Sequence, residues 1–395
     1  MSHRTRWTAV AVGVLLILVV VGRASGTRSF VDSAQSPSSS PAAVTGARGH
    51  ITALNVRGNQ LVDQDGAPVR LLGFNNSGAE YACAQGWGIF DSHAARNTRM
   101  SASTVAAMMT WRGANTVRVP LNEQCWLGPG VQRAYGGAAY QKAIRHFVSL
   151  LRSHGFVVVL DLHRSAPGRA RALEQEQMPS RSHSPDFWRG VATTFKDDTA
   201  VVFDVFNEPF PFDEADSRRA WSCWRDGGCR LPSRNASQTY TAAGMNELIT
   251  TIRATGARNV IAVGGIDWAA ALDRWLEYQP VDPLHNLVAS FHAYPHNRCA
   301  DESCFDTVLA RVASVVPLYA GEVGPDLDEN CTPANVAEAG FSERAFDWLD
   351  AHGASYTAWT WNVWNDCASL ISDYEGTPTP FWGREVRERL AGNSE

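Results

Sequence analysis

Two glutamates that end apolar segments are the residues best suited to carry chemistry. Glu208 ends the run VVFDVFNEP at residues 201–209, and Glu322 lies near the end of VPLYAGEVG at residues 316–324. β-Branched and aromatic side chains with one charge, Asp204, predict that the first run is a strand buried on both faces, as in a parallel sheet. The carboxyl ends of such strands form the catalytic face of a closed β/α barrel. Two carboxylates at that face predict an acid/base pair.

The elements that position these glutamates alternate between strand and helix from about His50 onward. Eight strand and helix units follow one another. This alternation predicts a parallel sheet with right-handed crossovers, and eight repeats predict a closed (β/α)8 TIM barrel of the α/β class. The predicted barrel strands cover residues 68–74, 115–122, 156–163, 201–209, 259–265, 287–294, 316–324 and 356–362. The predicted helices cover residues 103–112, 138–153, 185–195, 238–254, 268–276, 305–313 and 333–351.

An N-terminal β-hairpin is predicted to run into the first barrel strand. Residues 56–61 and 68–74 supply its two strands, and Asp65-Gly66 supplies the turn. No GxGxxG or GxxxxGK[ST] motif follows any predicted strand. Nucleotide-binding α/β folds therefore lack their phosphate cradle in this sequence.

Polar side chains end each of the predicted strands. Any single one is explained by a hydrogen bond inside the barrel, but the set converges at one end and predicts a site there. Two residues apart on one strand, His292 and Tyr294 face the same way, as do Asp161 and His163. The set comprises Asn75, Asn76, Arg118, Asn122, Asp161, His163, Asn207, Glu208, Asp267, His292, Tyr294, Glu322, Trp359 and Trp361.

Composition narrows the classes of function. The chain has 395 residues, 45% of them hydrophobic and 19% charged, which predicts a large core and argues against disorder. Its net charge of −5 and the lack of a basic stripe argue against a nucleic-acid partner. The 14 tryptophans are explained singly by core packing, or together by several that stack on sugar faces in a cleft.

The N-terminal segment predicts export. Arg4 and Arg6 precede an apolar run at residues 7–22, which is short for a membrane span and fits a secretory signal. An uncleaved anchor is the alternative, and the charges before the run place the rest of the chain outside in either case. We expect a signal peptide or anchor at residues 1–26, a Ser/Pro-rich linker at 27–49 and a catalytic barrel at 50–395. The protein is thus expected to be secreted, or membrane-anchored with its catalytic domain outside.

Eight cysteines agree with an oxidising compartment. Each follows a predicted strand, in the loops of the face that holds the two glutamates. A zinc site is the competing interpretation, but no CxxC pair is present. Their number allows 105 pairings; of these we favour two short loop closures and two links between neighbouring loops, which are Cys223 with Cys229, Cys299 with Cys304, Cys83 with Cys125, and Cys331 with Cys367.

The ordered strand-end residues resemble the catalytic core of family 5 glycoside hydrolases, the cellulase family of the retaining β/α-barrel clan. Asn207-Glu208-Pro209 after an apolar strand, the later FHAY and the Glu of AGEVG carry the resemblance, which extends over residues 55–380. It implies that Glu208 is the general acid/base and Glu322 the nucleophile. It also implies substrate-binding roles for the matching supporting residues Arg118, His163, Asn207, His292, Tyr294 and a tryptophan on the last strand.

Each implied role has a physical basis. Retaining hydrolysis needs two carboxyl groups about 5–5.5 Å apart. Arg118 near Glu322 is expected to lower the pKa of that nucleophile, and the Tyr294 hydroxyl to donate a hydrogen bond to it. A charged Glu322 is expected to raise the pKa of Glu208, which must hold its proton until transfer. Asn207 is expected to bind the sugar 2-hydroxyl; the two histidines could bind hydroxyls or tune Glu208, with no metal role.

Tryptophans are the expected sugar platforms. Trp361 is the first choice for the ring beneath the sugar at the cleavage point, and Trp359 is the alternative. Trp87, Trp126, Trp268 and Trp364 follow strands, and each is either a further platform or loop packing. The long loop at residues 164–184 and the insertion at 210–234 depart from the usual family pattern, which leaves the substrate open more than the reaction.

We therefore expect a retaining hydrolase of β-linked polysaccharide, foremost an endo-β-1,4-glucanase (cellulase). A β-mannanase or another β-glycan hydrolase is the enzymatic alternative, and a non-catalytic glycan-binding barrel at the cell surface is the alternative of a different class. The expected partner is a polysaccharide or oligosaccharide substrate. We expect no cofactor, no metal and no nucleic acid, a monomeric state, and a membrane tether only through the N-terminal segment.

Overall fold

The computed structural model describes residues 50–92, 98, 100–334 and 340–393. The predicted signal or anchor at residues 1–26 and the linker at 27–49 lie outside the described residues, so both stay predictions. Within the described part of the chain, no helix combines the length and apolar character that crossing a membrane requires.

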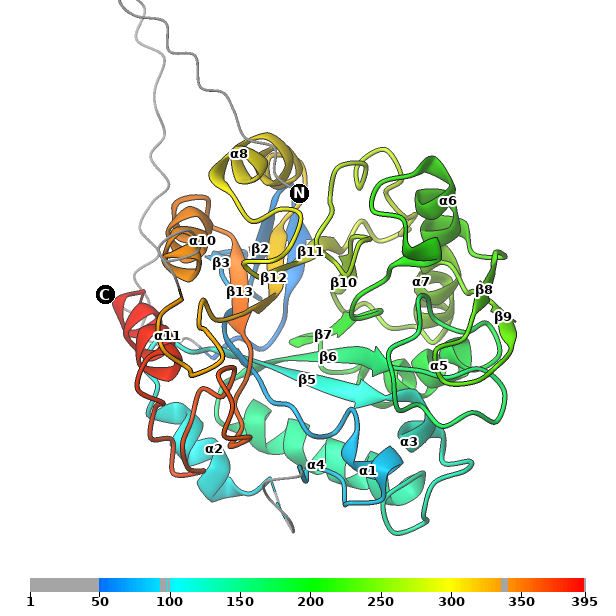
Figure 1. The fold of residues 1–395 in the computed structure, drawn as a ribbon, viewed down its shortest axis with the longest axis horizontal. Coiled ribbons are helices and arrows are strands. Elements are labelled where there is room, and N and C mark those ends of the chain that lie inside the picture. Colours follow the sequence, from blue (N-terminus) through cyan, green and yellow to red (C-terminus); the bar gives the residue numbers. More distant parts are fainter. Residues whose placement is uncertain (1–49, 93–97, 99, 335–339, 394–395) are drawn as a thin grey trace, which may run out of the picture. The chain divides into compact units, whose positions relative to one another are not determined.

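Eight parallel strands close into a barrel, which confirms the predicted (β/α)8 class (Figure 1). Every strand is buried along most or all of its length, as expected when helices cover the outside and side chains fill the inside. In barrel order the strands are β4 (Leu72–Asn75), β5 (Thr116–Asn122), β6 (Val157–Arg164), β7 (Val201–Asp204), β10 (Ile261–Gly264), β11 (Leu287–Ala293), β12 (Leu318–Val323) and β13 (Ser355–Ala358).

Helices surround the barrel (Figure 1). The longest, α4, buries an apolar stripe against the strands because Tyr140, Ile144, Phe147 and Leu151 recur at helical spacing. The helices are α1 (Ala82–Gln85), α2 (Ala102–Met109), α3 (Glu123–Leu127), α4 (Ala138–Ser153), α5 (Ser184–Phe195), α6 (Arg218–Asp226), α7 (Met245–Ala254), α8 (Glu302–Cys304), a π-helical turn Phe305–Leu309, α9 (Ala310–Ala313), α10 (Phe341–Ala351) and α11 (Trp382–Gly392), with a short turn at Pro211–Asp213.

Alternation along most of β6 shows how strands bring polar groups to the barrel mouth, and the pairing of β6 with β5 shifts register only at His163, near the end of the strand. Val157 and Val159 pack inside the barrel, whereas Val158 packs against the helices. The inward series continues with Asp161 and His163, which are two and four residues beyond Val159. Apolar packing at the bottom of the barrel thus gives way to charged and polar groups at the top.

A break in register on β12 turns Glu322 inward. Tyr319 faces the barrel interior and Ala320 the helices, so plain alternation from these residues would place Glu322 on the outside. The pairing of β12 with both neighbours shifts between Ala320 and Val323, and Val323 packs with the outer core. This irregularity lets Glu322 reach the barrel interior, as bulges beside active sites commonly do.

The N-terminal hairpin prediction was too simple. The segment forms a three-stranded antiparallel sheet of β1 (Asn55–Arg57), β2 (Gln60–Val62) and β3 (Pro68–Val69). The predicted strand over residues 56–61 is divided because Gly58 adopts a left-handed conformation with a φ of 60°. The predicted turn at Asp65-Gly66 is present between β2 and β3. Leu61 and nearby apolar residues pack against the inward-facing valines, which closes the lower end of the barrel.

Other helix predictions also need correction. Residues 268–276 form turns instead of a helix, because Asp267, Trp268 and Ala269 have left-handed φ angles of 58°, 60° and 60°. The helix predicted from residue 238 begins at Met245, since Thr239–Thr241 pairs as β9 with β8 (Arg230–Pro232). α11 was not predicted, and residues 335–339 of the helix predicted at 333–351 lie outside the described part.

All four favoured disulfides are present. Two close short loops and two join neighbouring loops, as expected from their positions after strands. The pairs are Cys83–Cys125, Cys223–Cys229, Cys299–Cys304 and Cys331–Cys367.

Candidate active site

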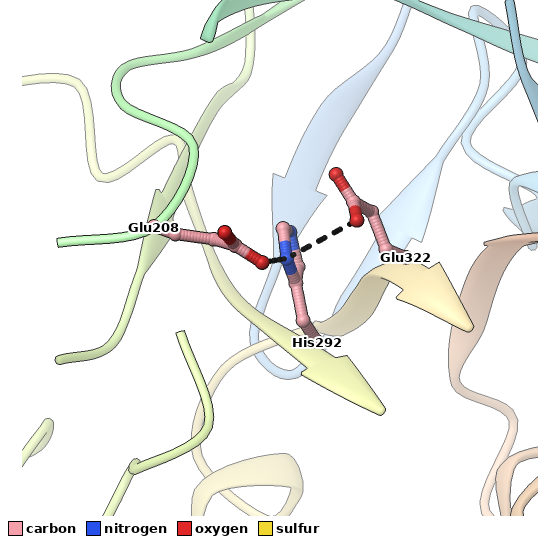
Figure 2. A group of neighbouring side chains, drawn as sticks. All are labelled: Glu208, His292 and Glu322. Carbon is pink, nitrogen blue, oxygen red and sulfur yellow. Dashed lines mark hydrogen bonds and ion pairs between the residues drawn. The ribbon is translucent and has the colours of Figure 1, made fainter. Parts of the chain in front are cut away.

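Glu208 and Glu322 meet at the barrel mouth from opposite sides of His292 (Figure 2). A carboxylate oxygen of each glutamate and a ring nitrogen of His292 all lie within 4.8 Å of one another. Nδ1 of His292 is 2.8 Å from Oε1 of Glu208 and 3.7 Å from Oε2 of Glu322. The two carboxylates are therefore at the short separation that a retaining mechanism requires, about 5–5.5 Å, rather than the wider one that leaves room for an attacking water.

Two donors hold the Glu322 carboxylate. Arg118 donates from Nη1 to Oε1 at 2.8 Å, and the Tyr294 hydroxyl donates to Oε2 at 2.7 Å. Burial raises the pKa of the Tyr294 hydroxyl well above its usual value, so this side chain stays a neutral donor. With one hydrogen bond to each oxygen, the plane of the carboxylate is fixed.

Arg118 is the hub beneath the site. Its side chain is fully buried and contacts Asp161 at 3.1 Å and Asp204 at 3.1 Å in addition to Glu322. It also donates to Oδ1 of Asn207 at 2.8 Å. Arg118 therefore links side chains from four strands, β5, β6, β7 and β12. Through Asn207 it also fixes the segment that carries Glu208 relative to the predicted nucleophile Glu322.

The two aspartates under Arg118 lie in an environment that disfavours negative charge. Burial raises the pKa of both Asp161 and Asp204, while the Arg118 guanidinium opposes the rise. Asp204 had no assigned role in the sequence prediction, although it was noted as the one charge of its strand. A lone charge in a strand that is buried on both faces needs a partner of opposite charge. This feature of the sequence was enough to predict that Asp204 belongs to the site, although the prediction was not made.

Burial determines the protonation states of Glu208 and His292. It raises the pKa of Glu208 to about 7, although the side chain keeps 20% of its surface exposed. The pKa of Glu208 is raised, as predicted. The leading cause is desolvation, however, whereas the charge of Glu322 was the expected cause. Burial also lowers the pKa of His292 to about 4, so a neutral imidazole faces Glu208 at neutral pH.

His163 lies at the rim of the site, away from direct contact with either glutamate. Nδ1 is 2.7 Å from Oδ2 of Asp161, and the ring stacks on Trp359 with centroids 5.5 Å apart. Burial lowers the pKa of His163 to about 4, so it is a neutral hydrogen-bonding group at neutral pH. Its predicted contact with substrate stays a prediction.

The expected platform Trp361 is contradicted by its burial. The side chain is fully buried, stacks on Phe74 with centroids 4.6 Å apart and packs edge-on against Trp111. A ring enclosed in this way has no face for a sugar. β13 ends at Ala358, so the alternation that was extended to Trp361 stops before it. Trp359, the alternative, is partly exposed beside His163 and takes the position of the platform candidate.

Gln175 is a site residue that the sequence prediction missed. Asn207 donates from Nδ2 to Oε1 of Gln175 at 2.8 Å, and Gln175 donates from Nε2 to the backbone carbonyl of Glu208 at 2.5 Å. Gln175 comes from the long loop between β6 and α5, and no motif or periodicity marks it. With Arg118 on its oxygen and Gln175 on its nitrogen, the Asn207 amide is oriented from both ends.

The four loop tryptophans divide between packing and exposure. Trp126 is buried, so it is explained by packing, and Trp364 donates from Nε1 to the Tyr81 hydroxyl at 2.8 Å. Trp87 is partly buried and packs edge-on against Tyr81. Trp268 keeps 36% of its surface exposed. Of the described loop residues in this set, Trp268 thus presents the most accessible ring.

The three side chains of Figure 2 also have the donor types of a metal site. Their closest atoms, however, are already engaged with one another, with Arg118 and with Tyr294. A buried guanidinium within the same cluster disfavours a second cation there. The expectation of no metal and no cofactor stays a prediction.

Comparison with known proteins identifies the family. The family described as Cellulase (glycosyl hydrolase family 5) matches residues 62–365. A mannan endo-1,4-beta-mannosidase of Salipaludibacillus agaradhaerens is 23% identical over 86% of this chain and 92% of its own length. An endoglucanase of a Microbulbifer species is 24% identical over 79% of this chain and 53% of its own length.

Solved structures agree on the fold. A beta-glucanase from Saccharophagus degradans, determined in complex with cellotetraose, superposes with a TM-score of 0.64 at 19% identity, covering 87% of this chain and 94% of its own. An endoglucanase catalytic domain from Thermobifida fusca has a TM-score of 0.56 at 17% identity, covering 86% and 97%. With the family match over most of the barrel and both carboxylates in place, the chain belongs to glycosyl hydrolase family 5, the cellulase family of retaining O-glycosyl hydrolases.

Proposed function

We propose that this protein is an endo-β-1,4-glucanase in which Glu208 is the general acid/base and Glu322 the nucleophile. The observation that carries the assignment is the approach of the two carboxylates, with oxygens within 4.8 Å, at the mouth of the barrel. That separation suits attack on the anomeric carbon from one side and protonation of the leaving oxygen from the other. Endoglucanases among the relatives and the cellotetraose complex of a structural neighbour support glucan as the substrate.

In the first step, Glu322 attacks the anomeric carbon and the glycosidic bond breaks. Glu208 gives its proton to the departing oxygen, so an alcohol leaves and a glycosyl ester of Glu322 forms. A pKa of about 7 leaves Glu208 largely protonated in mildly acidic solution, as this step needs. Arg118 and Tyr294 take no part in bond making or breaking. Their hydrogen bonds keep the Glu322 carboxylate oriented while it loses its negative charge.

In the second step, Glu208 acts as the base. It takes a proton from a water molecule that attacks the anomeric carbon, and the ester bond to Glu322 breaks with net retention of configuration. His292, neutral and 2.8 Å from Glu208, stays within hydrogen-bonding distance of the carboxyl in both steps. Asn207, oriented by Arg118 and Gln175, is placed to bind the 2-hydroxyl, a contact that strengthens in the transition state.

A β-mannanase is the second candidate. A mannan endo-1,4-beta-mannosidase is among the relatives, and the match spans 92% of its length. Glucose and mannose differ at the 2-hydroxyl, so the Asn207 region is where the two substrates would be distinguished. The non-catalytic glycan-binding barrel is disfavoured because both carboxylates and their hydrogen-bonding partners are in place.

Release of reducing sugar from β-glucan, mannan, xylan and galactan tests the proposal. The expected result is release from β-1,4-glucan that falls by several orders of magnitude in Glu322→Gln. Mannan as the better substrate would replace the glucanase by the mannanase. Undiminished release by Glu322→Gln would reject the catalytic assignment.

We also propose that the enzyme acts outside the cell. Four disulfides among the barrel loops favour an oxidising compartment. The charged and then apolar N-terminal sequence supports export, either through a cleaved signal or with a retained anchor. The monomeric state and the lack of a nucleic-acid partner stay predictions. Fractionation of the native host, followed by N-terminal sequencing of the mature enzyme, distinguishes the cleaved from the anchored form.

A further inference from the structure

A pocket of about 820 Å³ lies between α10, α11 and the segment that follows β12 (Figure 1). Among the described residues that line it, none belongs to the candidate active site. Acidic side chains predominate among its charged residues. They are Asp326, Glu343, Asp350, Glu385 and Glu388, against Arg384 and Arg389. The pocket is therefore a separate, negatively charged feature of the barrel's outer layer.

Asp326 brings a buried carboxylate oxygen without a donor to this pocket. The residue is 8% exposed, and its Oδ2 accepts a hydrogen bond of 2.9 Å from the amide of Phe341, the first residue of α10. Its Oδ1 is buried and has no hydrogen-bond partner among the described residues. A buried carboxylate oxygen costs free energy unless a proton, a water molecule or a cation meets it.

Glu385, in the first turn of α11, brings a second oxygen of this kind. Its Oε1 is buried and finds no hydrogen-bond donor within the described part of the chain. The Ser342 hydroxyl donates to the same carboxylate. Burial raises the pKa of Glu385, and the charges of Glu343 and Asp326 add to the rise. These oxygen-bearing side chains, which come from three segments, therefore lie within electrostatic reach of one another.

The two arginines of the pocket do not pair with these carboxylates. Arg389 is engaged with Asp347 at 2.6 Å and with Asp350 at 3.3 Å, so it opposes the pKa rise of Glu385 only from a distance. Arg384 is exposed, and among the described residues it forms no ion pair. A positive charge in direct contact with the two buried oxygens is thus what this arrangement lacks.

We propose that Asp326, Ser342 and Glu385, with Glu343 on the exposed side, bind a divalent cation of the Ca²⁺ type. Hard cations of this kind take carboxylate, hydroxyl and water oxygens as ligands, and the pocket has room for the waters. No histidine or cysteine is among the described lining residues, so the donors do not suit a softer metal. The proposal departs from the expectation of no metal, which considered the histidines and cysteines of the catalytic face.

A cation at this place joins three parts of the fold. Asp326 follows β12, the strand that carries Glu322, whereas Ser342 lies in the first turn of α10 and Glu385 in that of α11. The unfolded chain does not hold these donors together, so the ion binds the folded state preferentially and stabilises it. The expected effect is on stability, and it does not depend on the proposed function.

Thermal unfolding with and without calcium measures the effect. A site of the weak extracellular kind has a Kd of about 0.1 mM and is nearly saturated at about 10 mM CaCl₂. Relative to protein treated with a chelator, this concentration should raise Tm by about 3–4 °C for a chain of this size. NaCl at the same ionic strength is the control. Calorimetric titration with CaCl₂ should find one ion per chain.

Four variants locate the ion. Asp326→Asn and Glu385→Gln keep the shape of each side chain but remove its charge, and each should reduce the calcium-dependent shift to under about 1 °C. Glu329→Gln changes an exposed carboxylate of the same loop that does not line the pocket, and it should keep the full shift. Arg384→Gln removes a positive charge from the pocket and should keep or enlarge the shift. Cooperative unfolding in chelator shows that each variant is folded.

Three results would overturn the site. A wild type whose Tm does not respond to calcium would leave the two buried oxygens to share a proton instead. A shift that persists in both Asp326→Asn and Glu385→Gln would place the ion elsewhere on the chain. Loss of the shift in Arg384→Gln would contradict a bound cation, because the removal of a positive charge should favour it.

Discussion

Replacing Glu208 by glutamine should stabilise the protein in alkaline solution but not in acid. The folded state raises the pKa of this carboxyl from 4.5 to about 7, chiefly because burial disfavours the charged form. Between these two values the folded protein binds more protons at this group than the unfolded chain. The contribution of Glu208 to stability therefore falls as pH rises through this window. Glutamine does not ionise and escapes that penalty.

The magnitude follows from the size of the pKa change. A difference of about 2.5 pKa units is worth about 3 kcal/mol of unfolding free energy. Glu208→Gln should therefore be about 3 kcal/mol more stable than the wild type at pH 8, relative to the same comparison at pH 4. An active-site carboxyl that costs stability is the usual trade-off between stability and activity.

Urea unfolding of both proteins at pH 4 and pH 8 measures this difference. Glu388→Gln, on the exposed side of α11, is the matched control for the substitution itself. An equal effect of Glu208→Gln at the two pH values would refute the argument, because the carboxyl would then titrate alike in the folded and unfolded states.

Three further predictions concern pH, Arg118 and Gln175. The value of kcat/KM for cellotetraose should fall as pH rises through about 7, where Glu208 loses its proton. For β-cellobiosyl fluoride, whose fluoride ion leaves without a proton from Glu208, kcat/KM should not fall in this pH range. The same fall on both substrates would assign it to a group other than Glu208. Arg118→Leu leaves Asp161, Asp204 and the predicted nucleophile without their cation and should lower the unfolding free energy by about 3–5 kcal/mol, measured in urea; a loss under about 1 kcal/mol would contradict the buried network. Gln175→Ala should lower kcat/KM by about 2- to 10-fold, mainly through kcat, since it removes one neutral hydrogen bond that orients an amide acting in the transition state; an effect on KM alone would contradict this role.

The barrel was predictable because its signal is periodic. Each strand is an apolar run of the right length, and each polar residue at a strand end marks the catalytic face. Arg118, His292 and Tyr294 could be placed in one site from their strand positions alone. Glu322 is less simple: the resemblance and the end-of-strand position identified it, but its inward direction depends on a register shift that the sequence does not reveal.

The misplaced residues share a physical cause. Trp361 lies beyond the end of β13, where period-two alternation no longer fixes direction, and core packing against Phe74 determines its position. Gln175 reaches Asn207 from a loop whose path depends on partners distant in sequence, such as Asn235. The left-handed turn at residues 267–269 contains no glycine, the residue that most often marks such a turn in a sequence. Loop geometry fixed by tertiary hydrogen bonds is not recorded in local sequence pattern.

Trapping the covalent intermediate tests the central claim most directly. A 2-deoxy-2-fluoro-β-glycosyl fluoride of the disaccharide that the enzyme accepts carries a good leaving group but slows the breakdown of the ester, so a glycosyl enzyme should accumulate. Mass spectrometry should find one added fluorodisaccharide per chain, and peptide analysis should place it on Glu322. An active enzyme that gives no adduct, or an adduct on any other residue, would contradict the assignment of Glu322 as the nucleophile opposite Glu208.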